Sequence, residues 1–218
     1  MRAMRRALPL LLLAACSHAP LALHPTPVPI GYDNEDVLDV VPLDADRDGD
    51  TDLVVATPTQ LRYFARQAAG WIDETPGTAL DKVGPVLALR PDGADLLIER
   101  PDGSLARLVS SGIGTWHEGG VAPDRLPDPP RAVDADLDRD GRPDHAELDG
   151  RRVRVELRGA DGALHDETAA LGADALPLRG DGHALYAADL DGDGDLDLLA
   201  VGGRIMALLN NGGPAPAH

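Results

Sequence analysis

Short apolar runs bounded by turn-forming residues recur along most of this 218-residue chain. Residues 53–56 (LVVA) and 198–201 (LLAV) are examples, and each run follows an Asp-rich stretch. Apolar runs of about four to eight residues between turn signals are typical of buried strands. Residues 152–157 (RVRVEL) instead alternate charged and apolar side chains, which is typical of a strand with one exposed face. The pattern predicts an all-β protein.

The predicted strands group into four units of similar order. A first strand leads into a polar turn, a second strand leaves it, and a third follows after a short turn. We place the first strands at 37–43, 86–90, 131–135 and 184–188, the second at 53–56, 96–99, 145–148 and 198–201, and the third at 61–65, 105–109, 153–157 and 205–209. Units 1 to 3 have a fourth strand after a glycine, at 71–74, 115–118 and 164–167. Unit 4 needs its last strand from elsewhere, for example from the segment before Asp33.

The polar turns of units 1, 3 and 4 share the pattern D-x-D-x-D-G-x-x-D, and we name them loop 1 (44–52), loop 3 (136–144) and loop 4 (189–197). Calcium prefers six to eight oxygen ligands in a flexible geometry, and carboxylates at positions 1, 3 and 5 of such a loop can converge on one ion. Glycine at position 6 permits the sharp turn that this requires. The pattern therefore predicts three calcium sites, and the alternative is a set of solvated Asp-rich loops without metal.

Two other kinds of calcium loop fit the sequence less well. An EF-hand needs a glutamate at position 12 and a helix on each side. Position 12 holds Val55, Glu147 and Ala200, and strand-like apolar runs follow loops 1 and 4. Thrombospondin type 3 repeats share the spacing but depend on cysteine pairs, whereas Cys16 is the only cysteine in the chain.

The turn of unit 2 is a reduced version of the same pattern. It keeps Asp92-Gly93 but has no acid at positions 1 and 3. Pro91-Asp92-Gly93 is typical of a tight turn, so we predict that this turn binds no metal. With it, the Asp-Gly pairs of the four units lie 44, 48 and 53 residues apart, which is close to the 40–45 residues of a propeller blade.

The order of Asp-rich loop, apolar strand, turn, second strand and Asn-Asn-Gly resembles the FG-GAP/VCBS repeat of integrin-type β-propellers. Residues 188–201 and 208–213 carry the likeness most closely. The resemblance implies a β-propeller-like array of about four four-stranded blades, a small or partial propeller, with about three bound Ca²⁺. Family propellers usually have more blades, so closure by a second chain stays open as an alternative.

Carried over by position, the resemblance implies two kinds of calcium ligand. Side-chain ligands would be the aspartates at positions 1, 3, 5 and 9, which are Asp44, Asp46, Asp48, Asp52, Asp136, Asp138, Asp140, Asp144, Asp189, Asp191, Asp193 and Asp197. Backbone carbonyls would come from position 7, which is Asp50, Arg142 and Asp195.

The first residues predict export from the cytoplasm. Arg2, Arg5 and Arg6 precede a short apolar core that ends in Leu13-Ala-Ala-Cys16, which resembles the bacterial lipobox. We therefore predict a lipoprotein signal peptide at 1–15 and lipidation of Cys16. The alternative is an ordinary secretory signal with an incidental cysteine.

The rest of the chain divides into a tether, a domain and a tail. Residues 16–34 are rich in proline, which favours an extended tether. We assign residues 35–213 to the propeller domain and 214–218 to a tail. The predicted location is the bacterial cell envelope, where a lipid anchor would hold the domain at the outer membrane, in the periplasm or at the cell surface.

The charge of the chain excludes two classes of partner. It has 20 basic and 37 acidic residues, a net charge of −17, and without residues 1–15 the balance is 17 against 37, a net charge of −20. Nucleic acids and anionic lipid surfaces attract basic proteins. We therefore expect no nucleic-acid partner, and contact with a membrane only through the lipid anchor.

Catalytic motifs give little support for an enzyme. The sequence has no G-x-S-x-G, G-x-x-x-x-G-K-[ST] or H-E-x-x-H motif. His145 is the one histidine beside an acidic loop. Trp71 and Trp116 hold equivalent places in units 1 and 2, which favours repeat packing over sugar stacking.

We expect a calcium-binding, surface-tethered, non-enzymatic module for adhesion, ligand binding or assembly, with an unknown protein or glycan as partner. The alternatives are a polysaccharide-acting enzyme and an accessory subunit that completes a partner's propeller.

Overall fold

The computed structural model describes residues 21–28, 30, 37–173, 178, 182–210 and 212. Within these residues the chain forms sixteen β-strands and one short 3₁₀ turn, Leu80–Lys82, so the predicted all-β fold is confirmed. The predicted signal peptide, Cys16 and the tail at 214–218 lie outside the described residues. Within the described part of the chain, no helix has the length and apolarity that crossing a membrane requires.

The strands form four antiparallel four-stranded sheets, one for each predicted unit, which we call blades 1 to 4. Blade 1 contains β2 (Asp39–Leu43), β3 (Asp52–Ala56), β4 (Leu61–Gln67) and β5 (Gly70–Asp73). Blade 2 contains β6 (Ala88–Asp92), β7 (Asp95–Glu99), β8 (Leu105–Ser110) and β9 (Trp116–Glu118). Blade 3 contains β10 (Ala132–Ala135), β11 (Asp144–Asp149), β12 (Arg152–Arg158) and β13 (Leu164–Asp166). Blade 4 contains β14 (Ala184–Ala188), β15 (Asp197–Val201), β16 (Ile205–Asn210) and β1 (Leu23–Pro27).

The fourth strand of blade 4 comes from the beginning of the chain. β1 pairs antiparallel with β16, from Leu23 opposite Asn210 to Pro27 opposite Met206. It lies within the segment 16–34 that the sequence assigns to a tether, so this part of the segment is a strand of the sheet. Proline lacks an N–H group but is tolerated on edge strands, and Leu23, 3% exposed, anchors β1 in the core.

Three apolar clusters hold the blades together in the spatial order 3–4–1–2. One cluster joins blades 3 and 4, a second joins blades 4 and 1, and the third joins blades 1 and 2. β15 of blade 4 contributes to two of these clusters: Leu198 and Ala200 belong to the first, while Leu199 and Val201 belong to the second. Successive side chains of a strand point to opposite faces, so both faces of β15 are buried.

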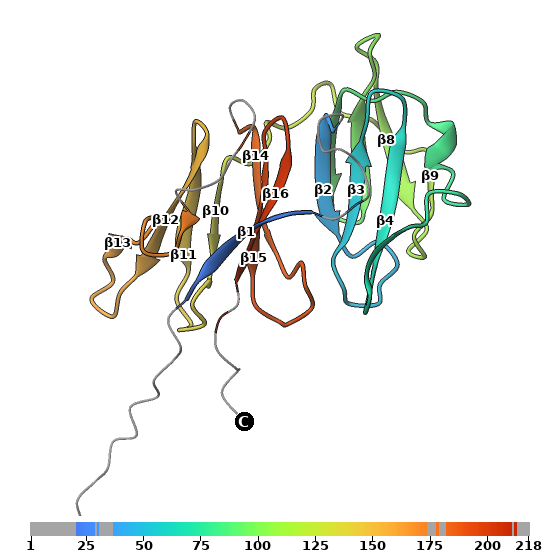
Figure 1. Ribbon diagram of the computed structural model, residues 1–218. Coiled ribbons are helices and arrows are strands. Elements are labelled where there is room, and N and C mark those ends of the chain that lie inside the picture. The colour runs from blue at the N-terminus through green and yellow to red at the C-terminus, as the bar shows by residue number, and fades with distance from the viewer. Residues whose placement is uncertain are drawn as a thin grey trace, which may run out of the picture.

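No cluster among the described residues joins blades 2 and 3, although they are consecutive in sequence. The sheets therefore form an open arc, and Figure 1 shows β10–β13 at one end and β8 and β9 at the other. The connections across packed interfaces carry buried apolar residues, such as Leu80 between blades 1 and 2 and Leu171 between blades 3 and 4. The connection from β9 to β10 instead exposes Val121 at 85%.

The two ends of the arc carry polar groups where inner blades carry apolar ones. On the outer face of blade 3, Arg154 pairs with Glu147 at 3.3 Å and with Glu156 at 2.7 Å. This confirms the half-exposed strand that the alternation in 152–157 predicts. On blade 2, Arg90 Nε donates to the carbonyl of Pro127 at 3.1 Å and Arg107 Nε to that of Val121 at 3.3 Å. The connection from β9 to β10 thus lies against the outer face of blade 2.

Candidate metal centres

Each acidic loop connects the first and second strands of its blade, so strands flank all three loops. This arrangement differs from the helix pair of an EF-hand. The glycine at position 6 is left-handed in every copy, with φ of +97° at Gly49, +84° at Gly141 and +85° at Gly194. Position 4 is left-handed as well, including two non-glycine residues, Arg47 (φ +68°) and Arg139 (φ +59°). The sequence pattern does not reveal this second turn position.

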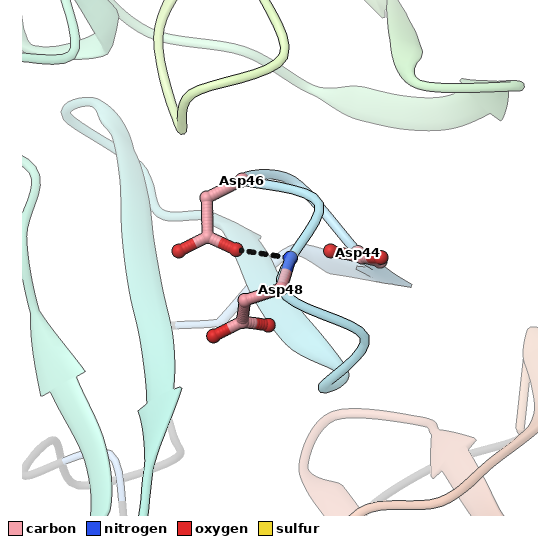
Figure 2. Close-up of side chains that lie close together, drawn as sticks. All are labelled: Asp44, Asp46 and Asp48. Atoms are coloured by element: carbon pink, nitrogen blue, oxygen red, sulfur yellow. Dashed lines mark hydrogen bonds between the residues drawn. The ribbon is translucent and has the colours of Figure 1, made fainter.

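The loops share one internal hydrogen-bond pattern. The backbone N–H of position 5 donates to the carboxylate of position 3, at 3.1 Å from Asp48 to Asp46 (Figure 2), and equally in loops 3 and 4. The N–H of position 7 donates to the carboxylate of position 5, at 2.9 Å in loop 1 and 2.8 Å in the other two. These local bonds fold each chain segment around its own carboxylates.

In each loop, three carboxylates bring one oxygen each to within 4.8 Å of the others. In loop 1 these are Asp44, Asp46 and Asp48, which Figure 2 shows around one turn of the chain. In loops 3 and 4 they are the acids at positions 1, 3 and 9, which are Asp136, Asp138, Asp144, Asp189, Asp191 and Asp197. Oxygen-only donor sets of this kind suit a hard cation such as Ca²⁺.

The acid at position 9 is completely buried and holds the blade together. Asp52, Asp144 and Asp197 are each 0% exposed. One oxygen accepts the backbone N–H of loop position 2, and the other accepts the N–H of a residue near the end of the third strand. In loop 4 these donors are Leu190 at 2.6 Å and Asn210 at 2.7 Å. The position-9 aspartate therefore has a structural role besides any ligation.

The remaining aspartates of the predicted ligand set lie outside these groups of three. Asp50 and Asp193 are exposed. Asp140 forms an ion pair with Arg142, whose Nε also donates to the carbonyl of Arg158 at 3.1 Å. Asp195 at position 7 is only 3% exposed and forms an ion pair with Arg139 of loop 3. Loops 3 and 4 are thus in direct contact, which their sequence spacing does not indicate.

Several carboxylates of the loops have a pKa above that of a free aspartate. Burial, together with the neighbouring charges of Asp48 and Asp44, raises the pKa of Asp46. Burial and adjacent loop carboxylates likewise raise the pKa of Asp138 and Asp191. For Asp197, burial raises the pKa to about 7. A bound divalent cation would offset this crowding of negative charge.

Each loop also lies at a packed interface between blades. The residue at position 2 is buried in an interblade cluster: Ala45 between blades 1 and 2, Leu137 between blades 3 and 4, and Leu190 between blades 4 and 1. In each loop, a backbone carbonyl also accepts a hydrogen bond from the neighbouring blade. The carbonyl of Ala45 accepts the N–H of Gly114 at 3.1 Å. The carbonyl of Leu137 accepts Asn210 Nδ2 at 2.7 Å, and that of Asp191 accepts the guanidinium of Arg66 at 2.5 Å. The apolar residue at position 2 is the one sequence signal of this placement.

The reduced turn of blade 2 lacks the acids at positions 1 and 3 but keeps Asp92 and an aspartate, Asp95, that accepts a backbone N–H from the third strand. Gly93 is left-handed (φ +65°) between β6 and β7, which confirms the predicted tight turn. Asp95 accepts the backbone N–H of Ser110 at 2.8 Å, as position 9 does in the acidic loops. Asp92 and Asp95 both form ion pairs with Arg107, so a cation of the chain itself already neutralises these two acids.

The two tryptophans and the histidine that the sequence analysis names contact other parts of their own blades. The indole of Trp71 donates to the carbonyl of Thr51 at 3.3 Å, and that of Trp116 donates to the carbonyl of Ala94 at 3.3 Å. Thr51 and Ala94 each precede a structural aspartate, so the two tryptophans have equivalent roles in repeat packing. His145 faces Asp134 at 2.8 Å on the outer side of blade 3, away from the carboxylates of loop 3.

Comparison with known protein families gives a match that falls on this part of the molecule. No curated protein matches the chain. Residues 136–200, from the start of loop 3 through most of β15, match the family described as FG-GAP-like repeat. This segment contains loops 3 and 4 and the interface at which they meet, and it is similar to an FG-GAP-like repeat.

Proposed function

We propose that this chain is a calcium-binding, non-enzymatic interaction module held at the bacterial cell envelope. The observation that carries the proposal is the convergence of three carboxylate oxygens in each of three loops of identical pattern. Only oxygen donors are present there, and the loop backbone and water can supply the further ligands that Ca²⁺ needs.

The position of the loops suggests what the ions do. Each loop buries its position-2 side chain between two blades and accepts a hydrogen bond from the neighbouring blade. An ion that fixes the loop therefore also fixes the interblade contact. In this proposal calcium stabilises the arc as a whole. This stabilisation matters more because a chain with one cysteine cannot form an internal disulfide.

The arc supports a self-contained module rather than a subunit that completes another propeller. Blade 4 receives its fourth strand from β1 of the same chain. The outer face of blade 3 carries the ion pairs of Arg154, and the connection from β9 to β10 lies against blade 2. Both ends are thus compatible with water.

Attachment to the envelope rests on the lipobox-like residues that end at Cys16. In the proposal, lipidation of Cys16 anchors the module in the outer membrane, and residues 17–22 link the anchor to β1 at Leu23. Cys16→Ser should abolish incorporation of a labelled fatty acid and release the protein from the membrane fraction. Unchanged fractionation of that variant would contradict a lipid anchor.

Calcium binding is tested by titration calorimetry of the chain lacking residues 1–15. We expect about three ions, with dissociation constants of roughly 0.1–1 mM, as in extracellular calcium modules. Asp191→Ala should remove one ion and leave two, counted by native mass spectrometry. A chain that binds no calcium at 10 mM would overturn the proposal.

The partner is tested by affinity capture from an envelope extract. Immobilised protein should retain a protein or glycan in calcium and release it on chelation. A matched column that carries the Asp46→Asn, Asp138→Asn, Asp191→Asn variant should retain nothing in either buffer. Equal capture by both columns would show that the loops have no part in binding.

A further inference from the structure

The hydrogen bonds of the position-9 aspartate differ between loop 1 and loops 3 and 4. In loops 3 and 4 each oxygen of that carboxylate accepts one backbone N–H. Asp52 accepts the same two bonds, from Ala45 at 3.0 Å and Arg66 at 2.7 Å. It also accepts a third, from the hydroxyl of Tyr63 to Oδ2 at 3.0 Å.

The hydroxyl of Tyr63 occupies a lone pair of the Asp52 carboxylate that a metal ion would need. A carboxylate oxygen has two lone pairs, and on Asp52 Oδ2 both now face donors, Ala45 N–H and the Tyr63 hydroxyl. The group of three carboxylates reflects this difference, because it includes position 9 in loops 3 and 4 but position 5 in loop 1.

Blade 2 holds the tyrosine in place. Tyr63 is 1% exposed, and its ring meets that of Trp116 edge to face, with centroids 5.4 Å apart. A Cβ atom on Gly114 would lie 3.1 Å from the same ring, so the backbone of the β8–β9 connection packs directly on it. The equivalent third-strand positions, Val155 in blade 3 and Ala207 in blade 4, have no hydroxyl group.

We propose that Tyr63 is an affinity-determining residue that withholds Asp52 from the metal centre of loop 1 and makes it the weakest of the three. The inference rests on the calcium binding proposed above. Calcium then fills loops 3 and 4 first, and loop 1 responds only at higher concentration. Loop 1 lies between blades 1 and 2, so that interface is the last of the three to be fixed by an ion.

The decisive variant is Tyr63→Phe, which keeps the ring and its contact with Trp116 and removes only the hydroxyl. It is made in an Asp138→Asn, Asp191→Asn background, so that calorimetry reports on loop 1 alone. We expect calcium affinity at loop 1 to rise about tenfold, because a tenfold change in affinity corresponds to the free energy that one charge-assisted hydrogen bond contributes. Tyr186→Phe, which removes a buried hydroxyl without a hydrogen-bond partner from blade 4, should leave it unchanged.

Unchanged or weaker calcium binding in Tyr63→Phe would overturn the inference, because the hydroxyl would then merely orient Asp52. So would a double-asparagine background in which loop 1 binds no calcium with or without the hydroxyl. Absence of binding by the native loops in every variant would instead overturn the proposed function itself.

A second measurement does not depend on the folding of Tyr63→Phe. Native mass spectrometry of the unaltered protein at graded calcium concentrations should show two ions before the third. Asp46→Asn should remove the late ion, while Asp191→Asn should remove an early one. Simultaneous filling of three sites, or loss of an early ion in Asp46→Asn, would contradict the proposed order.

Discussion

The turn of blade 2 and loop 4 of blade 4 occupy the same place in their sheets, yet only one of them is crowded with acids. Both keep the structural aspartate, Asp95 in blade 2 and Asp197 in blade 4, and each accepts a backbone N–H from the third strand. Loop 4 has further acids at positions 1, 3, 5 and 7, whereas the acids of the blade 2 turn are paired with Arg107.

The comparison separates two roles within one motif. Blade 2 is a complete four-stranded sheet without acids at positions 1 and 3, so these acids are not required to build a blade. Burial, together with the neighbouring carboxylates of the loop, raises the pKa of Asp191. In the proposed function a bound ion explains these acids, while position 9 serves the fold with or without an ion.

The largest effect should follow loss of the structural acid in calcium-free buffer. Asp197→Ala leaves the buried N–H groups of Leu190 and Asn210 without acceptors, which should lower the free energy of unfolding by roughly 2–5 kcal/mol. Asp191→Ala should change it by less than about 0.5 kcal/mol, because its hydrogen-bond partner Asp193 is exposed to water. Urea unfolding in chelator measures both.

Asp95→Ala extends this contrast to a blade without an acidic loop. It should also destabilise the protein, since Ser110 loses its acceptor. If Asp191→Ala proved as destabilising as Asp197→Ala without calcium, the two positions would not have separate roles.

A smaller effect should appear as a pH dependence of the calcium-free protein. An unfolded aspartate titrates near pH 3.9, whereas burial raises the pKa of Asp197 to about 7 in the fold. The folded state therefore binds more protons than the unfolded state between about pH 4 and 7, and its stability must fall as the pH rises through this window.

In chelator, we expect the free energy of unfolding to be roughly 1–2 kcal/mol lower at pH 7.5 than at pH 5, since each unit of raised pKa corresponds to about 1.4 kcal/mol and water around the loop screens part of this effect. Saturating calcium should remove this loss. Thermal unfolding at a series of pH values measures it, and stability that rises with pH in chelator would show that burial does not raise the pKa of Asp197 in the fold.

The smallest effect should come from the reduced turn. Asp92→Asn breaks an ion pair with Arg107 in which Asp92 is 43% exposed, so the stability change should stay below about 0.5 kcal/mol. The calcium response should not change at all. A weakened calcium response in thermal unfolding would mean that blade 2 holds an ion after all.

Much of the architecture can be predicted from short-range pattern. The fifteen strands expected from apolar runs lie within two residues of their observed bounds, because strand ends coincide with Gly, Asp and Pro turns. The exposure of single strands can also be predicted, since residues 152–157 alternate polar and apolar side chains, as a half-exposed strand does, whereas 198–201 are apolar throughout.

The contacts that distinguish one loop from another could not be predicted in this way. Arg139 meets Asp195, and Tyr63 meets Asp52, only because blades and strands distant in sequence pack together. β1 confirms the expectation that a segment before Asp33 completes unit 4, while the prolines around Leu23 equally fit an extended tether. Position 9 belongs to the group of three carboxylates in loops 3 and 4, but its second role as a buried acceptor of backbone N–H groups cannot be read from the sequence pattern.

Calcium-dependent unfolding of the native protein beside the Asp46→Asn, Asp138→Asn, Asp191→Asn variant tests the central claim most directly. At 10–100 times its dissociation constant, each bound ion should add about 1.4–2.7 kcal/mol to the free energy of unfolding of the native protein. The variant should fold in chelator and gain nothing from calcium. Equal stability of the native protein in calcium and in chelator, or an equal gain by the variant, would contradict the account.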